Sequence, residues 1–177
     1  MLSILQFIVD TAAALLGGLL LLRFWMQATR VRPPQQIGQF TFTLTDWLVL
    51  PLRRLVPGMG GYDWASLIGA FLVVVLASSL LLVAGADAQT MLLHALYRFL
   101  NWILYGFMAL LIIDAIFSWV NPHAPLAPFV HALNTPILRP IRRVVPPIGG
   151  LDLSVLVAVL LLQIALYVLR MVIPGPY

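Results

Sequence analysis

The side chains that could do chemistry in this sequence are few, and their types and spacing exclude the commonest reactions. The chain has no cysteine, which excludes a thiolate nucleophile, a disulfide and a cysteine-ligated metal. His94, His123 and His131 form no His-x-x-x-His spacing for zinc and no pair at one depth for haem. No Gly-x-Ser-x-Gly is present, and no histidine shares the depth of a serine in an apolar stretch. We therefore expect no catalytic residue, no metal site and no cofactor.

A twenty-residue motif that occurs twice is the most specific feature of the sequence. Residues 51–70 read PLRRLVPGMGGYDWASLIGA and residues 140–159 read PIRRVVPPIGGLDLSVLVAV, with identity at nine of twenty positions and no gap. The shared residues that could bind a partner or shape the chain are Pro51, Arg53, Arg54, Gly60, Gly61 and Asp63 in the first copy, and Pro140, Arg142, Arg143, Gly149, Gly150 and Asp152 in the second.

The arginine pairs of this motif predict docking to lipid phosphates or to a partner. Each arginine near an anionic membrane surface contributes about 1 kcal/mol to binding, and Arg139 adds a third guanidinium in the second copy. Proline removes a backbone donor, so we expect Pro51 and Pro140 to break or kink the amphipathic segments that lead into the arginines. The pattern indicates a broken amphipathic helix that lies in the membrane interface or dips into it.

The glycine pairs and the aspartates predict a tight turn followed by a helix start. Glycine tolerates the positive φ that such a turn requires. Asp63 and Asp152 each fall just before an apolar run, where a carboxylate can accept hydrogen bonds from free helix amides. We interpret both as N-caps. The alternative is that they line a cavity as ligands for ions or protons.

Polar side chains also interrupt the apolar stretches: Asp10, Arg23, Arg98, Asn101 and Asp114. An ionisable group inside a membrane usually finds a partner. An offset of 91 aligns Arg23 with Asp114, so we hypothesise that these two pair, and that Asp10 reaches Arg98 or Asn101. The pairs would act either as clasps between helices or as the lining of a hydrated path.

The elements that must position these residues are membrane helices. Of 177 residues, 62% are hydrophobic and 9% charged, whereas soluble domains carry about 25% charged residues. A hydrocarbon core of about 30 Å needs a helix of about 20 residues. The expected spans are Leu2 to Met26, Trp64 to Val83, Met91 to Val120 and Leu153 to Ile173.

The placement of arginine predicts how these spans are oriented. The two long segments between spans 1 and 2 and between spans 3 and 4 hold seven of the ten arginines, whereas the link Ala84 to Thr90 holds none. By the positive-inside rule both long segments are cytoplasmic and both termini lie outside the cytoplasm. The fold expected is all-α and integral to the membrane: four transmembrane helices in two parallel tandem repeats, 1–88 and 89–177, each with a cytoplasmic interfacial amphipathic segment.

The second copy of the motif resembles a known family. The run from Leu133 to Ser154, LNTPILRPIRRVVPPIGGLDLS, together with Arg23 to Gln27 and Ile116 to Pro122, is similar to the signature of the YggT family of small bacterial inner-membrane proteins, which has cyanobacterial and chloroplast relatives. The first copy departs from it, because Asp46-Trp47 stands where the second has Thr135-Pro136. The resemblance implies roles in cell division or envelope organisation, or in osmotic tolerance and ion uptake.

Two hypotheses for function follow. The first is a non-catalytic organiser or assembly factor of the cell envelope, located in the bacterial inner membrane and acting through its basic segments. The second is a small channel or transporter for ion homeostasis under osmotic stress. The expected partners are anionic phospholipid, membrane or cytoplasmic proteins and further copies of the chain, with no direct contact to nucleic acid.

Overall fold

The computed structural model describes residues 2–145 and 153–173, and every regular element of these residues is a helix. The helices are α1 (Leu2–Ala28), α2 (Gln35–Leu55), α3 (Trp64–Ser78), α4 (Leu80–Val83), α5 (Ala88–Val120), α6 (Ala127–Val144) and α7 (Ser154–Val172). In proteins, most of the stability of a helix comes from the packing of its faces rather than from local propensity.

Four stretches of helix are long and apolar enough to cross a membrane: Ile4–Ala28, Trp64–Val83, Ala88–Val120 and Ser154–Val172. They agree with the four expected spans to within three residues at each boundary, which confirms the prediction of four such helices. Large apolar side chains are exposed along them, for example Leu76 at 70% and Met171 at 68%. Exposure of this kind suits a surface that is covered by lipid rather than by water.

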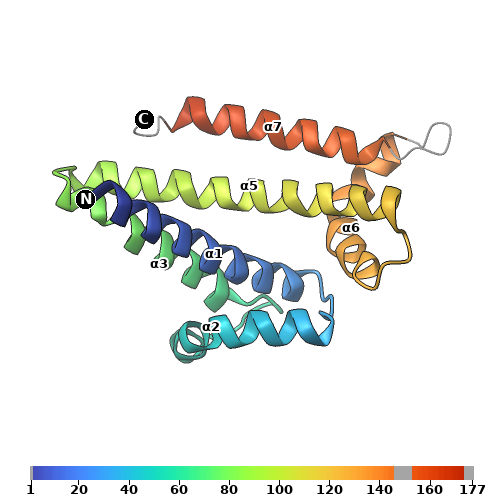
Figure 1. Ribbon diagram of the computed structural model, residues 1–177, viewed down its shortest axis with the longest axis horizontal. Coiled ribbons are helices and arrows are strands. Elements are labelled where there is room, and N and C mark those ends of the chain that lie inside the picture. The colour runs from blue at the N-terminus through green and yellow to red at the C-terminus, as the bar shows by residue number, and fades with distance from the viewer. Residues whose placement is uncertain (1, 146–152, 174–177) are drawn as a thin grey trace.

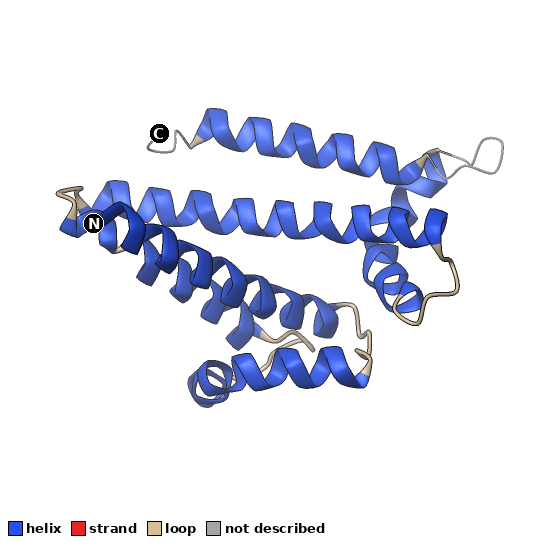
Figure 2. Cartoon of the chain, in the orientation of Figure 1, coloured by secondary structure: helices blue, strands red, loops and turns tan. Residues whose placement is uncertain are grey.

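Helices α1, α3, α5 and α7 run roughly along one axis, whereas α6 runs across it, and most links lie toward the two ends of that axis (Figure 1). The start of α1, the end of α7 and the link from α4 to α5 lie toward one end, whereas the links from α1 to α2 and from α5 to α6 lie toward the other. Figure 2 shows most loops at these ends, whereas the link from α2 to α3 lies away from both. Helices α1 and α3 pack along each other, and α5 lies beside both.

The apolar core is divided between the two halves of the chain. Seven buried residues from α1, α2 and α3 form one cluster: Ala13, Leu20, Val49, Ala65, Ala70, Val73 and Ala77. Leu111, Leu138 and Ala158, from α5, α6 and α7, form the other. Each half therefore buries its amphipathic helix, α2 or α6, against its own pair of long helices.

We expected the prolines to break or kink the amphipathic helices, and they do not break them. Helix α2 continues through Pro51, and α6 continues through Pro136 and Pro140. Figure 1 shows the carboxyl-terminal part of α2 nearly end-on while the rest of the helix lies across the view, so the helix bends without a break. The buried residues of α2, which include Thr45 and Val49, all precede Pro51, and Leu52 beyond it packs against the core cluster. This packing offsets the one backbone donor that Pro51 lacks.

Candidate functional site

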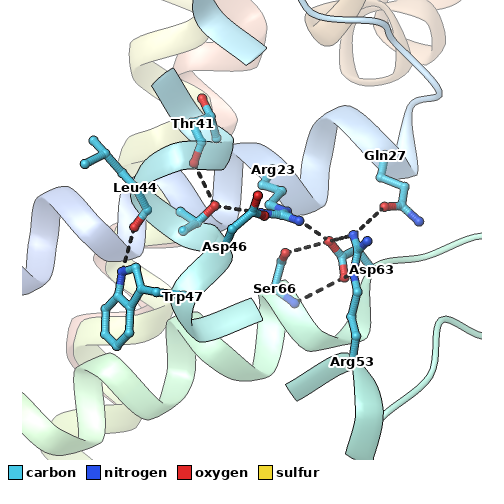
Figure 3. Close-up of polar contacts among 10 residues, drawn as sticks. Arg23, Gln27, Thr41, Leu44, Asp46, Trp47, Arg53, Asp63 and Ser66 are labelled. Carbon is cyan, nitrogen blue, oxygen red and sulfur yellow. Dashed lines mark hydrogen bonds and ion pairs between the residues drawn. The ribbon is translucent and has the colours of Figure 1, made fainter. Parts of the chain in front are cut away.

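Arg23 is a nearly buried cation at the centre of a polar cluster between α1, α2 and α3. The residue is 5% exposed. Its Nη1 donates to Asp46 Oδ1 over 2.6 Å and to Thr45 Oγ1 over 2.8 Å, and its Nε lies 3.4 Å from Asp63 Oδ2 (Figure 3). Its guanidinium also lies 4.9 Å from the centre of the Phe42 ring. We call Arg23, Asp46, Arg53, Asp63 and Ser66 the Arg23 cluster.

Asp63 is the acidic centre of the Arg23 cluster and the N-cap residue of α3. Its side chain accepts from the Ser66 backbone N–H over 3.4 Å and from Ser66 Oγ over 2.6 Å. Arg53 grips the same carboxylate with two hydrogen bonds, Nε to Oδ1 over 3.2 Å and Nη2 to Oδ2 over 2.6 Å. A bidentate pair of this kind is among the stronger polar contacts in proteins. One aspartate thus starts α3 and ties it to both α1 and α2.

The contacts between Asp63 and Arg53 stabilise the charged forms of both side chains. Burial alone would raise the pKa of Asp63, but the hydrogen bonds from Arg53 and Ser66 and the nearby charges of Arg53 and Arg23 outweigh it and hold that pKa below its usual value. The hydrogen bond to Asp63 in turn raises the pKa of Arg53. Asp63 thus joins the cap of α3 and the ion pair with Arg53 in one structure.

The hypothesis that Arg23 pairs with Asp114 is wrong. Arg23 pairs with Asp46 and Asp63, and Asp114 lies 3.4 Å from His131 Nδ1 on α6. Each half packs its own amphipathic helix against its own long helices, so the nearest partner lies on that helix rather than across the molecule. Matching depth along two helices does not make their side chains face each other.

The other polar residues of the spans find partners near the opposite end of α1 and α5. Arg98 Nη1 donates to Asp10 Oδ1 over 2.6 Å, which is one of the two partners that the sequence suggested for Asp10. Asn101 is 8% exposed and donates to the Tyr97 carbonyl of its own helix. The Asp10–Arg98 pair joins the first half of the chain to the second.

The arginines expected to dock lipid or a partner fall into two groups. Arg53 is bound to Asp63, and Arg142 is half-buried and makes a polar contact of its own. Arg54, Arg139 and Arg143 are exposed, and within residues 2–145 and 153–173 their guanidinium groups have no hydrogen bond or ion pair. The two arginines of one pair therefore differ in role, although the sequence presents them as equals.

The turn expected after the first arginine pair has the geometry that glycine favours. Gly60 and Gly61 adopt φ of 68° and 83°, and the Tyr62 N–H donates to the Met59 carbonyl. Gly149, Gly150 and Asp152, the corresponding positions of the second copy, lie outside the described residues.

Sequence reasoning missed Asp46 and Thr45, which together hold the Arg23 guanidinium. The available signal was the spacing on α2: Asp46 and Arg53 are seven residues apart and so lie on one helical face. Asp46 was noted as a departure from the second copy of the motif, and its partner becomes evident only when α2 is placed beside α1.

Fold and cluster together define an all-helical chain with four helices able to cross a membrane and two amphipathic helices tied to them by polar contacts. The family model CCB3/YggT matches residues 2–84 and 93–173. The chain belongs to the CCB3/YggT family.

Relatives from three bacteria are similar to the chain over most of its length. The protein YggT of Escherichia coli strain K12 is 34% identical over 161 residues, which cover 90% of this chain and 86% of that protein. A protein in the proC 3' region of Vibrio alginolyticus is 33% identical over 185 residues, covering 97% and 96%. The protein PA0392 of Pseudomonas aeruginosa is 35% identical over 165 residues, covering 89% and 84%. No solved structure is significantly similar, and the names of these relatives state no activity.

Proposed function

We propose that this protein is a non-catalytic organiser or assembly factor of the bacterial cell envelope, which docks anionic lipid and partner proteins through the basic ends of α2 and α6. The observation that carries the proposal is the set of three exposed guanidinium groups, those of Arg54, Arg139 and Arg143, which have no polar partner in the described chain. An exposed arginine beside a membrane helix is placed to meet lipid phosphates or the carboxylates of a partner, whose oxygens the guanidinium matches.

The shape of α2 supports an interfacial position for these groups. Phe40, Leu44, Trp47 and Leu55 recur at spacings of three, four and eight residues and are all exposed, Trp47 by 64%. They form an apolar stripe that is separate from the face packed on α1 and α3. A helix with such a stripe lies in the plane of the interface, and tryptophan favours that depth. The stripe would enter the lipid while Arg54 remains at the level of the phosphates.

The same arrangement supports a location in the inner membrane with α2 and α6 on the cytoplasmic side. Both helices carry their arginines in the last turn, where cations also favour the helix dipole. Arginine-rich segments beside spans stay on the cytoplasmic side during insertion. This proposal predicts that labels placed at Arg54 and at Arg143 react from the same side of the membrane.

In-cell photo-crosslinking tests the docking role. A photo-reactive amino acid at position 139 or 143 should trap a recurrent protein or anionic lipid, and the variant R139E/R143E should lose that adduct while its helix content and membrane insertion stay unchanged. Arg170→Glu is the matched control, because Arg170 is exposed and lies in the last turn of α7. This variant should keep the adduct. Equal crosslinking in the wild type and in a well-folded R139E/R143E variant would exclude the role.

A small channel or transporter is the second candidate, because α5 buries polar groups within a candidate span. Asn101 and Asp114 are each 8% exposed and lie on the same helix. Buried polar residues at such positions often mark ion pathways. Flux of K⁺, Na⁺ or protons through liposomes that contain the purified protein, abolished by Asp114→Asn, would favour this candidate. No flux above that of empty liposomes would leave the residues as contacts between helices.

A further inference from the structure

A cavity of about 650 Å³ lies beside the Arg23 cluster, at the junction of α1 and α2. Four arginines line it (Arg23, Arg30, Arg32 and Arg53), against the single carboxylate of Asp46. Asp63, just outside the lining, also pairs with Arg23 and Arg53, so four positive and two negative charges leave a net charge of +2 at the cavity. So concentrated a positive charge in a concave site attracts an anion.

The backbone of Arg30 supports a role for its side chain in this cavity. Helix α1 ends in a Schellman motif, in which Val31 N–H donates to the Met26 carbonyl and Arg30 N–H to that of Gln27. The residue that follows the last helical residue in such a motif has a positive φ and is therefore usually glycine. Here that residue is Arg30, with φ of 56°. A non-glycine residue with a positive φ is strained, and residues strained in this way cluster at functional sites such as ligand-binding sites.

Several hydrogen-bond donors on the cavity wall have no partner among the described residues. Within the described ranges, the guanidinium groups of Arg30 and Arg32 make no hydrogen bond or ion pair, and Arg23 Nη2 has no hydrogen-bond partner. Asp46 and Asp63 are satisfied by Arg23 and Arg53 from inside the protein (Figure 3). The positive charge that remains uncompensated therefore belongs to Arg30 and Arg32, at the exposed side of the cavity.

The chemistry of these groups points to phosphate. Planar guanidinium groups match the oxygens of a phosphate with paired N–H donors. Apolar side chains also line the cavity, among them Met26, Val31 and Phe42, and these suit the carbon atoms of a phosphate ester. We propose that this cavity binds a phosphate group, carried either by an anionic phospholipid or by a small soluble phosphate ester. The proposal does not depend on the docking role, which uses Arg54, Arg139 and Arg143.

Ligand binding to the full-length protein in uncharged detergent micelles tests this inference. The probes are phosphatidylglycerol and glycerol 3-phosphate, with zwitterionic phosphatidylcholine for comparison, and the readouts are native mass spectrometry and calorimetry. Arg30→Gly and Arg32→Gln remove the free guanidinium groups. Arg170→Gln is the matched control, since Arg170 is exposed, does not line the cavity and has no part in the docking role.

We expect Arg30→Gly to weaken binding about tenfold or more, because charge-assisted hydrogen bonds to the phosphate are lost. Its melting temperature should be unchanged or higher, since glycine relieves the positive φ. Arg32→Gln should weaken binding similarly, and Arg170→Gln should keep it within about twofold because a distant exposed charge is screened. Binding of phosphatidylglycerol alone identifies a lipid site, and binding of glycerol 3-phosphate as well identifies a site for the soluble ester.

Two results would overturn the inference. The first is that neither probe binds more tightly than phosphatidylcholine does. The second is that Arg170→Gln weakens binding as much as Arg30→Gly and Arg32→Gln, because the attraction would then come from the net positive charge of the protein rather than from this cavity.

Discussion

Arg98 of α5 donates a hydrogen bond over 2.6 Å to Asp10 of α1, which lies 88 residues earlier in the chain. The side chains of Arg98 and Asp10 are 15% and 30% exposed, so each is partly buried within the protein. We expect a double-mutant cycle of Asp10→Asn and Arg98→Gln to give a coupling of about 1–2 kcal/mol in the free energy of unfolding in detergent. Strictly additive losses would show that the pair does not hold α1 to α5.

The glycine pair in α1 predicts two opposite effects of adding one methyl group. A Cβ at Gly17 would overlap the Trp102 ring of α5, whereas a Cβ at Gly18 would meet nothing within 4 Å. Gly17→Ala should therefore lose about 1–3 kcal/mol of stability, since the indole must move. Gly18→Ala should be neutral or gain up to about 1 kcal/mol from helix propensity. Thermal unfolding in one detergent checks both, and equal melting temperatures would contradict the packing of α1 on α5.

Arg53 and Arg54 are neighbours in sequence and should differ in their effect on stability. Arg53→Gln removes two hydrogen bonds to Asp63 and should cost about 1–2 kcal/mol, a value that allows for the partial exposure of Arg53. Arg54→Gln should change stability by no more than about 0.5 kcal/mol. The comparison uses melting temperatures of two variants that differ by one position, and the same loss in both would disprove the bidentate clasp.

The Arg23 cluster predicts loss of stability in acid. The pKa of Asp63 is lower in the folded protein than its usual value, so the unfolded chain binds the proton more tightly. The stability that Asp63 contributes is then fully present above about pH 4 and is lost as the pH falls through the folded pKa. Melting temperatures measured from pH 7 to pH 3 should fall steeply below about pH 4. Asp63→Asn should lower the curve at neutral pH and make its acid limb shallower, and an acid limb as steep as in the wild type would contradict the assignment.

The four long helices could be read from the sequence because a membrane helix is a local property. Length and hydropathy alone select a run such as Trp64–Val83, and the structure changes its description only by a short interruption at Ser79. There the hydroxyl of Ser79 donates to the Leu76 carbonyl and competes with the backbone ladder. The N-terminal signal of α3 was also local, since Asp63 lies three residues before the Ser66 amide that it caps.

The pairing of charges could not be read in this way. A repeat alignment places Arg23 and Asp114 at one depth, but only the packing of α2 against α1 shows that Arg23 faces Asp46. The direction in which a side chain leaves its helix depends on the rotation of that helix about its axis, and neighbours from other elements fix that rotation.

The same reason separates the two kinds of arginine. The composition of the chain and the positions of its arginines identify a basic membrane protein with amphipathic segments. Charge and hydropathy can be summed along the sequence and do not depend on the tertiary structure. Whether a given guanidinium is bound to a carboxylate, as in Arg53, or lines a cavity without a partner, as in Arg30, depends on which helices meet around it. Contacts between helices join residues far apart in the chain, so the spacing of residues within a single segment does not predict them.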